Sequence, residues 1–272
     1  GGGGDDSINA GAGDDTIIGD QTAANDGEDT IDGGAGNDTI YGDSTGDASG
    51  VSSTTEFSWE DQGIADGNSV TSGITGLTTN GDIQVTMTIA QEANFNQAIM
   101  SNATLYNYNG LDDDSSISLE GGISGQNGTN QNTAIVTLDF AAAETGYSNE
   151  VSNVTFGIFD LDLLAGQFSD QVIITAYDAD GNEVPVVLTT IGTGGTAITV
   201  NDDTATATTD NQVGDTDDPS DVDGFVQVSV AGPVASITID YNNVDTAYGN
   251  HAIRIGDIEL DTIADASTPE GG

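Results

Sequence analysis

Hydrophobic and polar residues alternate along most of the chain after residue 56. In 83–89, apolar side chains at every second position alternate with Gln84, Thr86 and Thr88. A period of two places one face of a strand against a core and the other toward solvent. Similar candidate strands are 57–59, 134–140, 154–158, 171–177, 184–190, 197–200, 226–230, 237–241 and 253–260.

These segments amount to roughly nine or ten strands over roughly 210 residues, with turn signals between them and no long helical period. The pattern predicts an antiparallel β-sandwich of jelly-roll type over residues 57–263. Only 90–100 could hold a short helix. We expect a linker at 48–56 and a tail or second linker at 264–272.

The first 47 residues follow a different period, of nine. The units 1–9, 10–18 and 33–41 and the partial unit 27–32 match Gly-Gly-x-Gly-x-Asp-x-U-x, where U is a large apolar residue. An insertion at 21–26 interrupts the third unit. The eighth positions are Ile8, Ile17, Ile31 and Ile40, and the sixth positions are Asp6, Asp15, Asp29 and Asp38.

Both residue types in this repeat suit a hard cation. Ca²⁺ takes about 6–8 oxygen ligands, from carboxylates, carbonyls and water. Glycine turns tightly through φ > 0 and can aim carbonyl oxygens inward. The candidate metal ligands are therefore the sixth-position aspartates, together with Gly2, Gly4, Gly11, Gly13, Gly27, Gly34 and Gly36, and Asp20 and Asp43, which follow the second and fourth units.

One isoleucine in nine residues is too small a core to offset a backbone entropy cost of about 1–2 kcal/mol per residue. Metal binding must then supply the folding free energy. The alternative is a Gly/Asp linker without fixed structure, but isoleucines recurring in phase favour the folded interpretation.

The nonapeptide resembles the calcium-binding repeat of RTX proteins, which form a parallel β-roll. The resemblance covers residues 1–47 and implies one coil per unit. It also implies ions between successive coils, held by the sixth-position aspartates and by glycine carbonyls. RTX proteins typically leave bacteria by type I secretion, so the expected location is extracellular or the cell surface. Because the repeats are already in progress at Gly1, we expect a piece of a longer chain.

The charge balance excludes several classes of partner. The chain has one Lys+Arg, 46 Asp+Glu and a net charge of -45. Nucleic-acid binding needs cations along the phosphates, so it is excluded, and no run approaches the ~20 apolar residues of a membrane span. Anionic surfaces would be repelled unless Ca²⁺ bridged them. The absence of cysteine excludes thiol nucleophiles and thiolate metal sites.

Three acidic segments of the sandwich are candidate calcium sites. Asp178 and Asp180 precede a glycine at alternate positions, as in calcium loops, although Asp-Gly is also a common hairpin turn. Asp160 and Asp162 resemble a metal pair at a strand end. The segment 215–223 carries five carboxylates and is either a solvated loop or a calcium site.

Two further groups could serve other chemistry. Tyr106 and Tyr108 would share one face of a strand, where they could stack on a sugar or else cover the core. His251 and Arg254 lie near the last strand, where an ion pair among acids is expected over a catalytic role.

Nothing in the sequence marks out an enzyme, because no Ser-His-Asp order or His-rich zinc motif is present. The segments 57–63, 175–182 and 255–260 resemble sandwich domains of large marine bacterial surface proteins. We therefore expect a calcium-stabilised structural or adhesive module of a surface, matrix or filament protein. The alternative is a carbohydrate-binding module that anchors a larger secreted protein. Expected partners are calcium and either polysaccharide or copies of the chain itself.

Overall fold

The structure is a computed structural model that describes residues 7–13, 16–18, 30–36, 39–41, 53–92, 94–101, 115–122, 132–190, 198–208, 224–245 and 249–264. The chain divides into two compact units, Gly1–Val51 with Ala264–Gly272, and Ser52–Ile263. Within the described ranges there is no helix long and apolar enough to cross a membrane.

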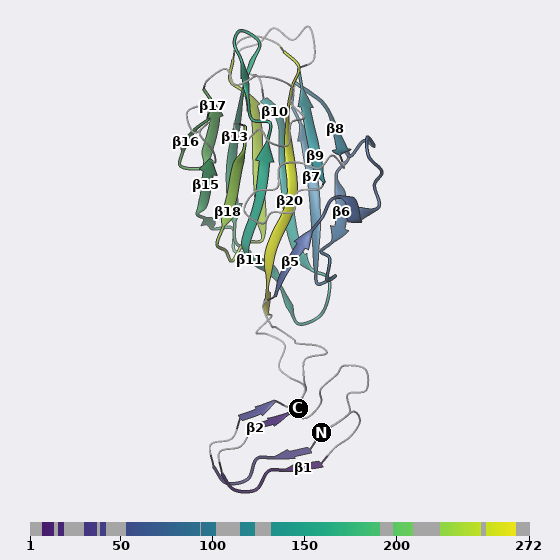
Figure 1. The fold of residues 1–272 in the computed structure, drawn as a ribbon, viewed down its shortest axis with the longest axis vertical. Helices are drawn as coiled ribbons and strands as arrows, with labels where there is room; N and C mark the ends of the chain where they lie inside the picture. The colour runs from purple at the N-terminus through teal and green to yellow at the C-terminus, as the bar shows by residue number, and fades with distance from the viewer. Residues whose placement is uncertain are drawn as a thin grey trace. The chain divides into compact units, whose positions relative to one another are not determined.

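The first unit contains four three-residue strands that pair in parallel (Figure 1). They are β1 (Ser7–Asn9), β2 (Thr16–Ile18), β3 (Thr30–Asp32) and β4 (Thr39–Tyr41). β1 pairs with β3 and β2 with β4, which aligns Ile8 with Ile31 and Ile17 with Ile40. Each strand therefore pairs with the unit two further along, so one coil consists of two nonapeptides. The expectation of one coil per unit was wrong.

The interruption of the third unit leaves this register intact. Asn9 and Asp32 are partners 23 positions apart, which is five more than two intact nonapeptides require. Thr16 and Thr39 show the same offset. The apolar eighth positions remain aligned because the extra residues all fall between β2 and β3, and the inserted segment 21–26 lies outside the described residues.

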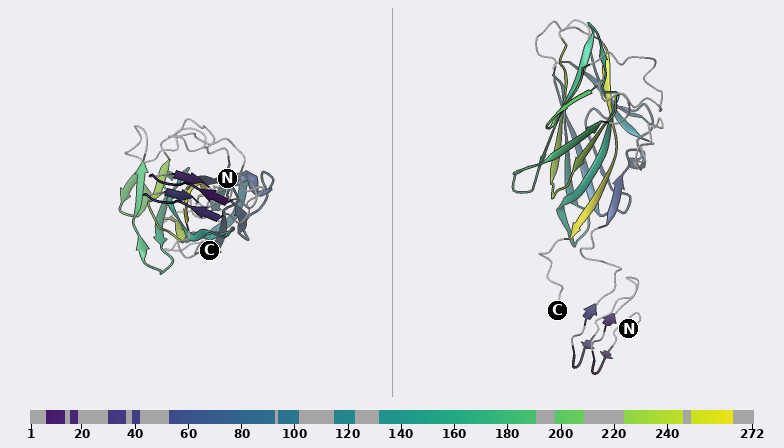
Figure 2. Two further views of the ribbon diagram at one scale, coloured as in Figure 1. Left: turned by 90° about the horizontal axis from the view of Figure 1, so that it is seen from below. Right: turned by 60° about the vertical axis from the view of Figure 1, so that its left-hand side comes forward.

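The second unit is a sandwich of two antiparallel sheets (Figure 2). The strands of the first sheet, in spatial order, are β16 (Ile198–Asn201), β17 (Thr204–Ala207), β13 (Phe168–Tyr177), β19 (Ser236–Asn243), β10 (Asn132–Ala142), β7 (Ile83–Gln91) and β6 (Ile74–Leu77), with β12 (Leu163–Leu164) and β14 (Glu183–Val184) beside β13. Those of the second are β15 (Val186–Thr190), β18 (Val226–Val230), β11 (Tyr147–Phe159), β20 (His251–Ala264), β9 (Ser116–Gly121) and β8 (Phe95–Ser101), with β5 (Thr54–Phe57) beside β20.

The alternation read from the sequence produces the core between these sheets. In β7, Ile83, Val85 and Met87 are buried while Gln84 and Thr88 are exposed. Trp59 is fully buried and packs edge-on against Phe57, with ring centroids 5.0 Å apart. The predicted fold class, a short parallel roll followed by an antiparallel sandwich, is confirmed.

The segment 90–100, the one candidate for a helix, is extended instead. β7 continues to Gln91, and β8 runs from Phe95 to Ser101 beside β9. Ala98 and Met100 alternate into the core, so sheet pairing overrides the high helix propensity of the alanines. At the other end, β5 begins at Thr54, within the segment predicted as linker.

Candidate functional site

The described glycines of the roll adopt the conformations that its turns require. Gly11, Gly13, Gly34 and Gly36 have φ values of +98°, +136°, +87° and +152°, a region that favours glycine over residues with a Cβ. Ala35 N donates to Gly11 O and Gly13 N donates to Ala35 O, both at 2.8 Å. These two bonds join the turn after β1 to the turn after β3, one coil further on.

Gly34 is required by space as well as by conformation. A Cβ at this residue would lie 1.8 Å from Gly11 O, whereas a Cβ at Gly11 would meet no atom within 4 Å. The backbones of neighbouring coils therefore touch at Gly34.

This contrast gives a matched pair of variants. Both Gly11→Ala and Gly34→Ala force a left-handed residue with a side chain, at a cost of about 1–3 kcal/mol. We expect Gly11→Ala to raise the calcium concentration at the folding midpoint about tenfold. Gly34→Ala should raise it far more or abolish folding of the roll. Circular dichroism during a calcium titration measures both, and equal midpoints for the two variants would contradict the observed stacking.

Asp32, at the ninth position of the third unit, links the turn to the sheet and was not singled out in the sequence. Its Oδ1 accepts a hydrogen bond from Gly34 N at 3.0 Å, and its Oδ2 accepts one from Asn9 Nδ2 at 3.2 Å. The repeat does not specify the residue at its ninth position. The only sequence signal for Asp32 was therefore that two of the four units, the first and the third, have an Asn or Asp there.

The described part of the roll has the glycine turns that a calcium-binding repeat requires. Four glycines hold the tight turns, and the first and third units are in register. The other predicted ligands, Gly2, Gly4, Asp6, Asp15, Asp20, Gly27, Asp29, Asp38 and Asp43, lie outside the described residues, so their role stays a prediction. Oxygen donors of these types are what a hard divalent cation takes.

The segment 178–183 forms the hairpin turn between β13 and β14. Asn182 donates to both carboxylate oxygens of Asp178, from its backbone N at 2.7 Å and from Nδ2 at 2.9 Å. These hydrogen bonds lower the pKa of Asp178, and Gly181 supplies φ +81°. Asp180 is exposed. Within the described ranges, no group of three or more His, Asp or Glu side chains is placed to hold a metal ion.

Several other candidates fall where the structure gives no description. Tyr106 and Tyr108, the possible sugar platform, lie outside the described residues, as does the acidic segment 215–223.

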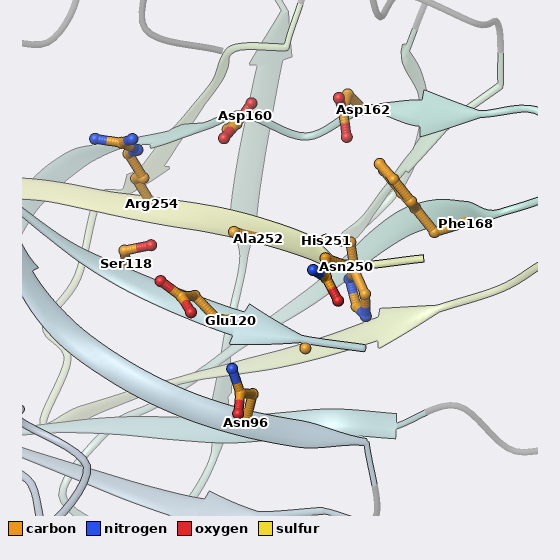
Figure 3. A pocket seen from close by; sticks show the side chains of 11 residues that line it. Asn96, Ser118, Glu120, Asp160, Asp162, Phe168, Asn250, His251, Ala252 and Arg254 are labelled. Carbon is orange, nitrogen blue, oxygen red and sulfur yellow. The ribbon is translucent and has the colours of Figure 1, made fainter. Parts of the chain in front are cut away.

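Four residues that the sequence singled out separately meet in one pocket of about 270 Å³ (Figure 3). Asp160 and Asp162 follow β11, and His251 and Arg254 belong to β20, the neighbouring strand in the second sheet. Figure 3 shows Asp160 and Asp162 on one side of β20 and Glu120 on the other. Asp160 holds a left-handed conformation, with φ +64°. The sheet order, rather than any motif, brings these side chains together.

The far wall of the pocket is built by β8 and β9. The register places Glu120 opposite Ala252 and Ser118 opposite Arg254. Gln97 Nε2 donates to Glu120 Oε2 at 2.8 Å, and Arg254 Nη1 donates to Ser101 Oγ at 3.4 Å. Glu120 is therefore held in place by a neighbouring strand. No local pattern pointed to Glu120, because its position in the pocket follows from a long-range strand pairing.

His251 forms part of a buried hydrogen-bond network at the base of the pocket. Its Nδ1 lies 2.9 Å from Asp170 Oδ1, which also accepts from Tyr241 OH at 2.9 Å. Asn94 Nδ2 lies 3.2 Å from His251 Nε2. Since an amide nitrogen only donates, Nε2 of the neutral ring accepts and the ring proton sits on Nδ1, facing Asp170. In place of the expected ion pair with surface acids, His251 thus forms a hydrogen bond to a buried aspartate.

Burial is the main cause of the pKa shifts in this network. It raises the pKa of Asp170 well above its ordinary value, opposed by hydrogen bonds from Tyr241 and Asp162. Burial lowers the pKa of His251 to about 4, opposed by the charge of Asp162. The pKa of Tyr241 is also raised, by burial first and by Asp170 second. The neutral forms of all three groups are therefore favoured in the folded state.

Comparison with known proteins identifies the repeats and gives little for the sandwich. Residues 1–22 and 23–47 match the family of the RTX calcium-binding nonapeptide repeat, in four copies, which confirms the resemblance read from the sequence. No curated protein matches the chain.

Two solved structures resemble the sandwich loosely. The K1 cleaved adhesin domain of Lys-gingipain from Porphyromonas gingivalis W83 is 12% identical, with a TM-score of 0.35, over 78% of this chain and 98% of that one. TmCBM27, a carbohydrate-binding module with specific mannan recognition, is 11% identical, with a TM-score of 0.30, over 78% of this chain and 96% of that one. TM-scores this low support no conclusion about function.

Proposed function

We propose that the chain is a calcium-stabilised structural or adhesive module of a secreted bacterial surface, matrix or filament protein. The observation that carries this proposal is the stacking of alternate nonapeptides through glycines in left-handed conformations. The repeats match the RTX family, whose members are typically secreted extracellular bacterial proteins.

The chemistry of the roll supports folding after secretion. Each of its four short strands has one isoleucine at the eighth position of the repeat, and of these Ile17 is buried while Ile8 and Ile31 are half-buried. So small a core leaves folding dependent on the cation that the sixth-position aspartates and glycine carbonyls would hold. Such a segment stays unfolded where free calcium is scarce and folds where it is abundant.

The large negative charge supports an assembly role that calcium controls. A net charge of -45 keeps copies of the chain apart at low ionic strength through mutual repulsion. Divalent ions that neutralise part of this charge would allow copies to pack.

Light scattering and electron microscopy of the purified chain test the assembly role. We expect ordered polymers or sheets when calcium is added, and dispersed chains in chelator or in magnesium at equal ionic strength. A chain that stays monomeric at millimolar calcium and adheres to no surface would contradict the structural role.

A second role, anchoring to polysaccharide, is favoured by the polar pocket on the second sheet. In this role the sandwich would bind polysaccharide, and the roll would be a separate unit that folds with calcium. We propose that neither role involves catalysis by this chain.

A further inference from the structure

We infer that the pocket between β9, β20 and the end of β11 binds one unit of an uncharged saccharide. This inference rests on the second role proposed above and assigns it a location and a ligand class. It adds a second candidate sugar site to the one predicted at Tyr106 and Tyr108, which lie outside the described residues.

The pocket offers hydrogen-bond donors and acceptors side by side. Glu120, Asp160 and Asp162 supply carboxylate oxygens, while Arg254 supplies guanidinium N–H groups. Asn96 and Asn250 at the exposed rim supply both kinds of group. A sugar hydroxyl donates one hydrogen bond and accepts others, so a ligand rich in hydroxyls can use both sides of this lining.

The charges of the lining select against anionic ligands. Three carboxylates and one guanidinium line the pocket, in a chain of net charge -45 whose only Lys or Arg is Arg254. A uronate or sulfate group would meet repulsion from the carboxylates and from the whole molecule. An uncharged polyol avoids this repulsion and can use both the carboxylate oxygens and the guanidinium N–H groups.

The pocket is formed before any ligand arrives. Gln97 Nε2 donates a hydrogen bond of 2.8 Å to Glu120 Oε2. Buried hydrogen bonds to Asp170 and Tyr241 fix the orientation of the His251 ring. Phe168 stacks against that ring, with centroids 5.7 Å apart. A rigid lining carried on strands lowers the ordering cost of binding. The volume of about 270 Å³ lies below the common range of ligand pockets, about 300–1,000 Å³, and so favours a single sugar unit.

Isothermal titration calorimetry tests the inference on the full chain with saturating calcium. The probes are neutral hexasaccharides of glucose, mannose, xylose and galactose, and charged counterparts, a hexauronate and a sulfated hexasaccharide. Glu120→Gln preserves the shape of the side chain and removes its charge, and Arg254→Gln removes the guanidinium group and its charge. Asp139→Asn, at an exposed site on β10 of the other sheet, is the matched control.

We expect at least one neutral probe to bind, with affinity reduced tenfold or more in each pocket variant and unchanged in Asp139→Asn. Absence of binding to every neutral probe, unchanged binding in both pocket variants, or binding confined to the charged probes would each overturn the inference. Calcium uptake and calcium-dependent assembly are measured on the same samples. If these remain while saccharide binding is absent, the pocket assignment fails and the structural module stands.

Discussion

Removal of calcium is expected to unfold residues 1–47 while the sandwich stays folded. The roll has three-residue strands and few buried side chains, so it lacks the apolar burial needed to offset backbone entropy. The sandwich has a continuous core drawn from both sheets, so we expect it to stay folded without the ion. Hydrogen exchange should show loss of protection in β1 to β4 on chelation and unchanged protection in β10, β13 and β19.

Substitution of two sixth-position aspartates tests whether these residues hold the calcium. Asp15→Ala together with Asp38→Ala should lower the calcium stoichiometry and unfold residues 1–47 at calcium concentrations that saturate the parent chain. The fluorescence of Trp59, the one tryptophan of the chain and fully buried in the sandwich, should not change. Unchanged stoichiometry by calorimetry would refute the ligand assignment, and a shift in Trp59 fluorescence would show that the two units fold together.

The local parts of this fold were predictable because they follow from short-range patterns. The repeat of Ile8, Ile17, Ile31 and Ile40 indicated the roll, and the alternation in β7 and β10 indicated half-buried strands. The pairing of alternate nonapeptides was not predictable from the repeat itself. A nine-residue unit fixes the shape of each turn but not how many turns complete one coil.

The candidate site in the sandwich depends on pairings that no local pattern contains. Asp160 and His251 are far apart in sequence and meet because β11 and β20 are neighbours. Asp170 follows Phe168 in β13 and reads as an ordinary polar position, yet it is fully buried. Its burial follows from the Tyr241 hydroxyl and the His251 ring that face it, since a buried carboxyl persists where such partners exist.

Loss of the Asp170 carboxyl is expected to be the most destabilising single change in the sandwich. Asp170→Ala leaves the Tyr241 hydroxyl and the His251 Nδ1–H buried without their acceptor. Each buried donor left without its acceptor costs about 1–3 kcal/mol. Asp170→Asn keeps an acceptor oxygen and should cost less, and Asp139→Ala, on the exposed side of β10, should cost little. Urea unfolding followed by Trp59 fluorescence measures all three, and equal midpoints for Asp170→Ala and Asp139→Ala would contradict the role of the network.

The same network predicts a distinct response to acid. The pKa of His251 falls from 6.5 to about 4 on folding because of burial. Between these two pH values the unfolded chain binds a proton that the folded chain does not, so stability is lost as the pH falls from about 6.5 to about 4. A pKa difference of this size corresponds to about 3 kcal/mol. The raised pKa of Asp170 acts in the opposite direction, because that contribution is lost as the pH rises through the folded value.

Comparison of His251→Gln with the parent chain isolates the histidine from the many surface acids, whose mutual repulsion also changes with pH. The gap in unfolding free energy between the two chains should narrow by about 3 kcal/mol from pH 7 to pH 4, because only the parent chain carries the histidine penalty. Asp162 and Asp170 are present in both chains, so their own contributions to the pH dependence largely cancel. A gap that stays constant over this range would mean that the ring is charged in the folded state, paired with an ionised Asp170.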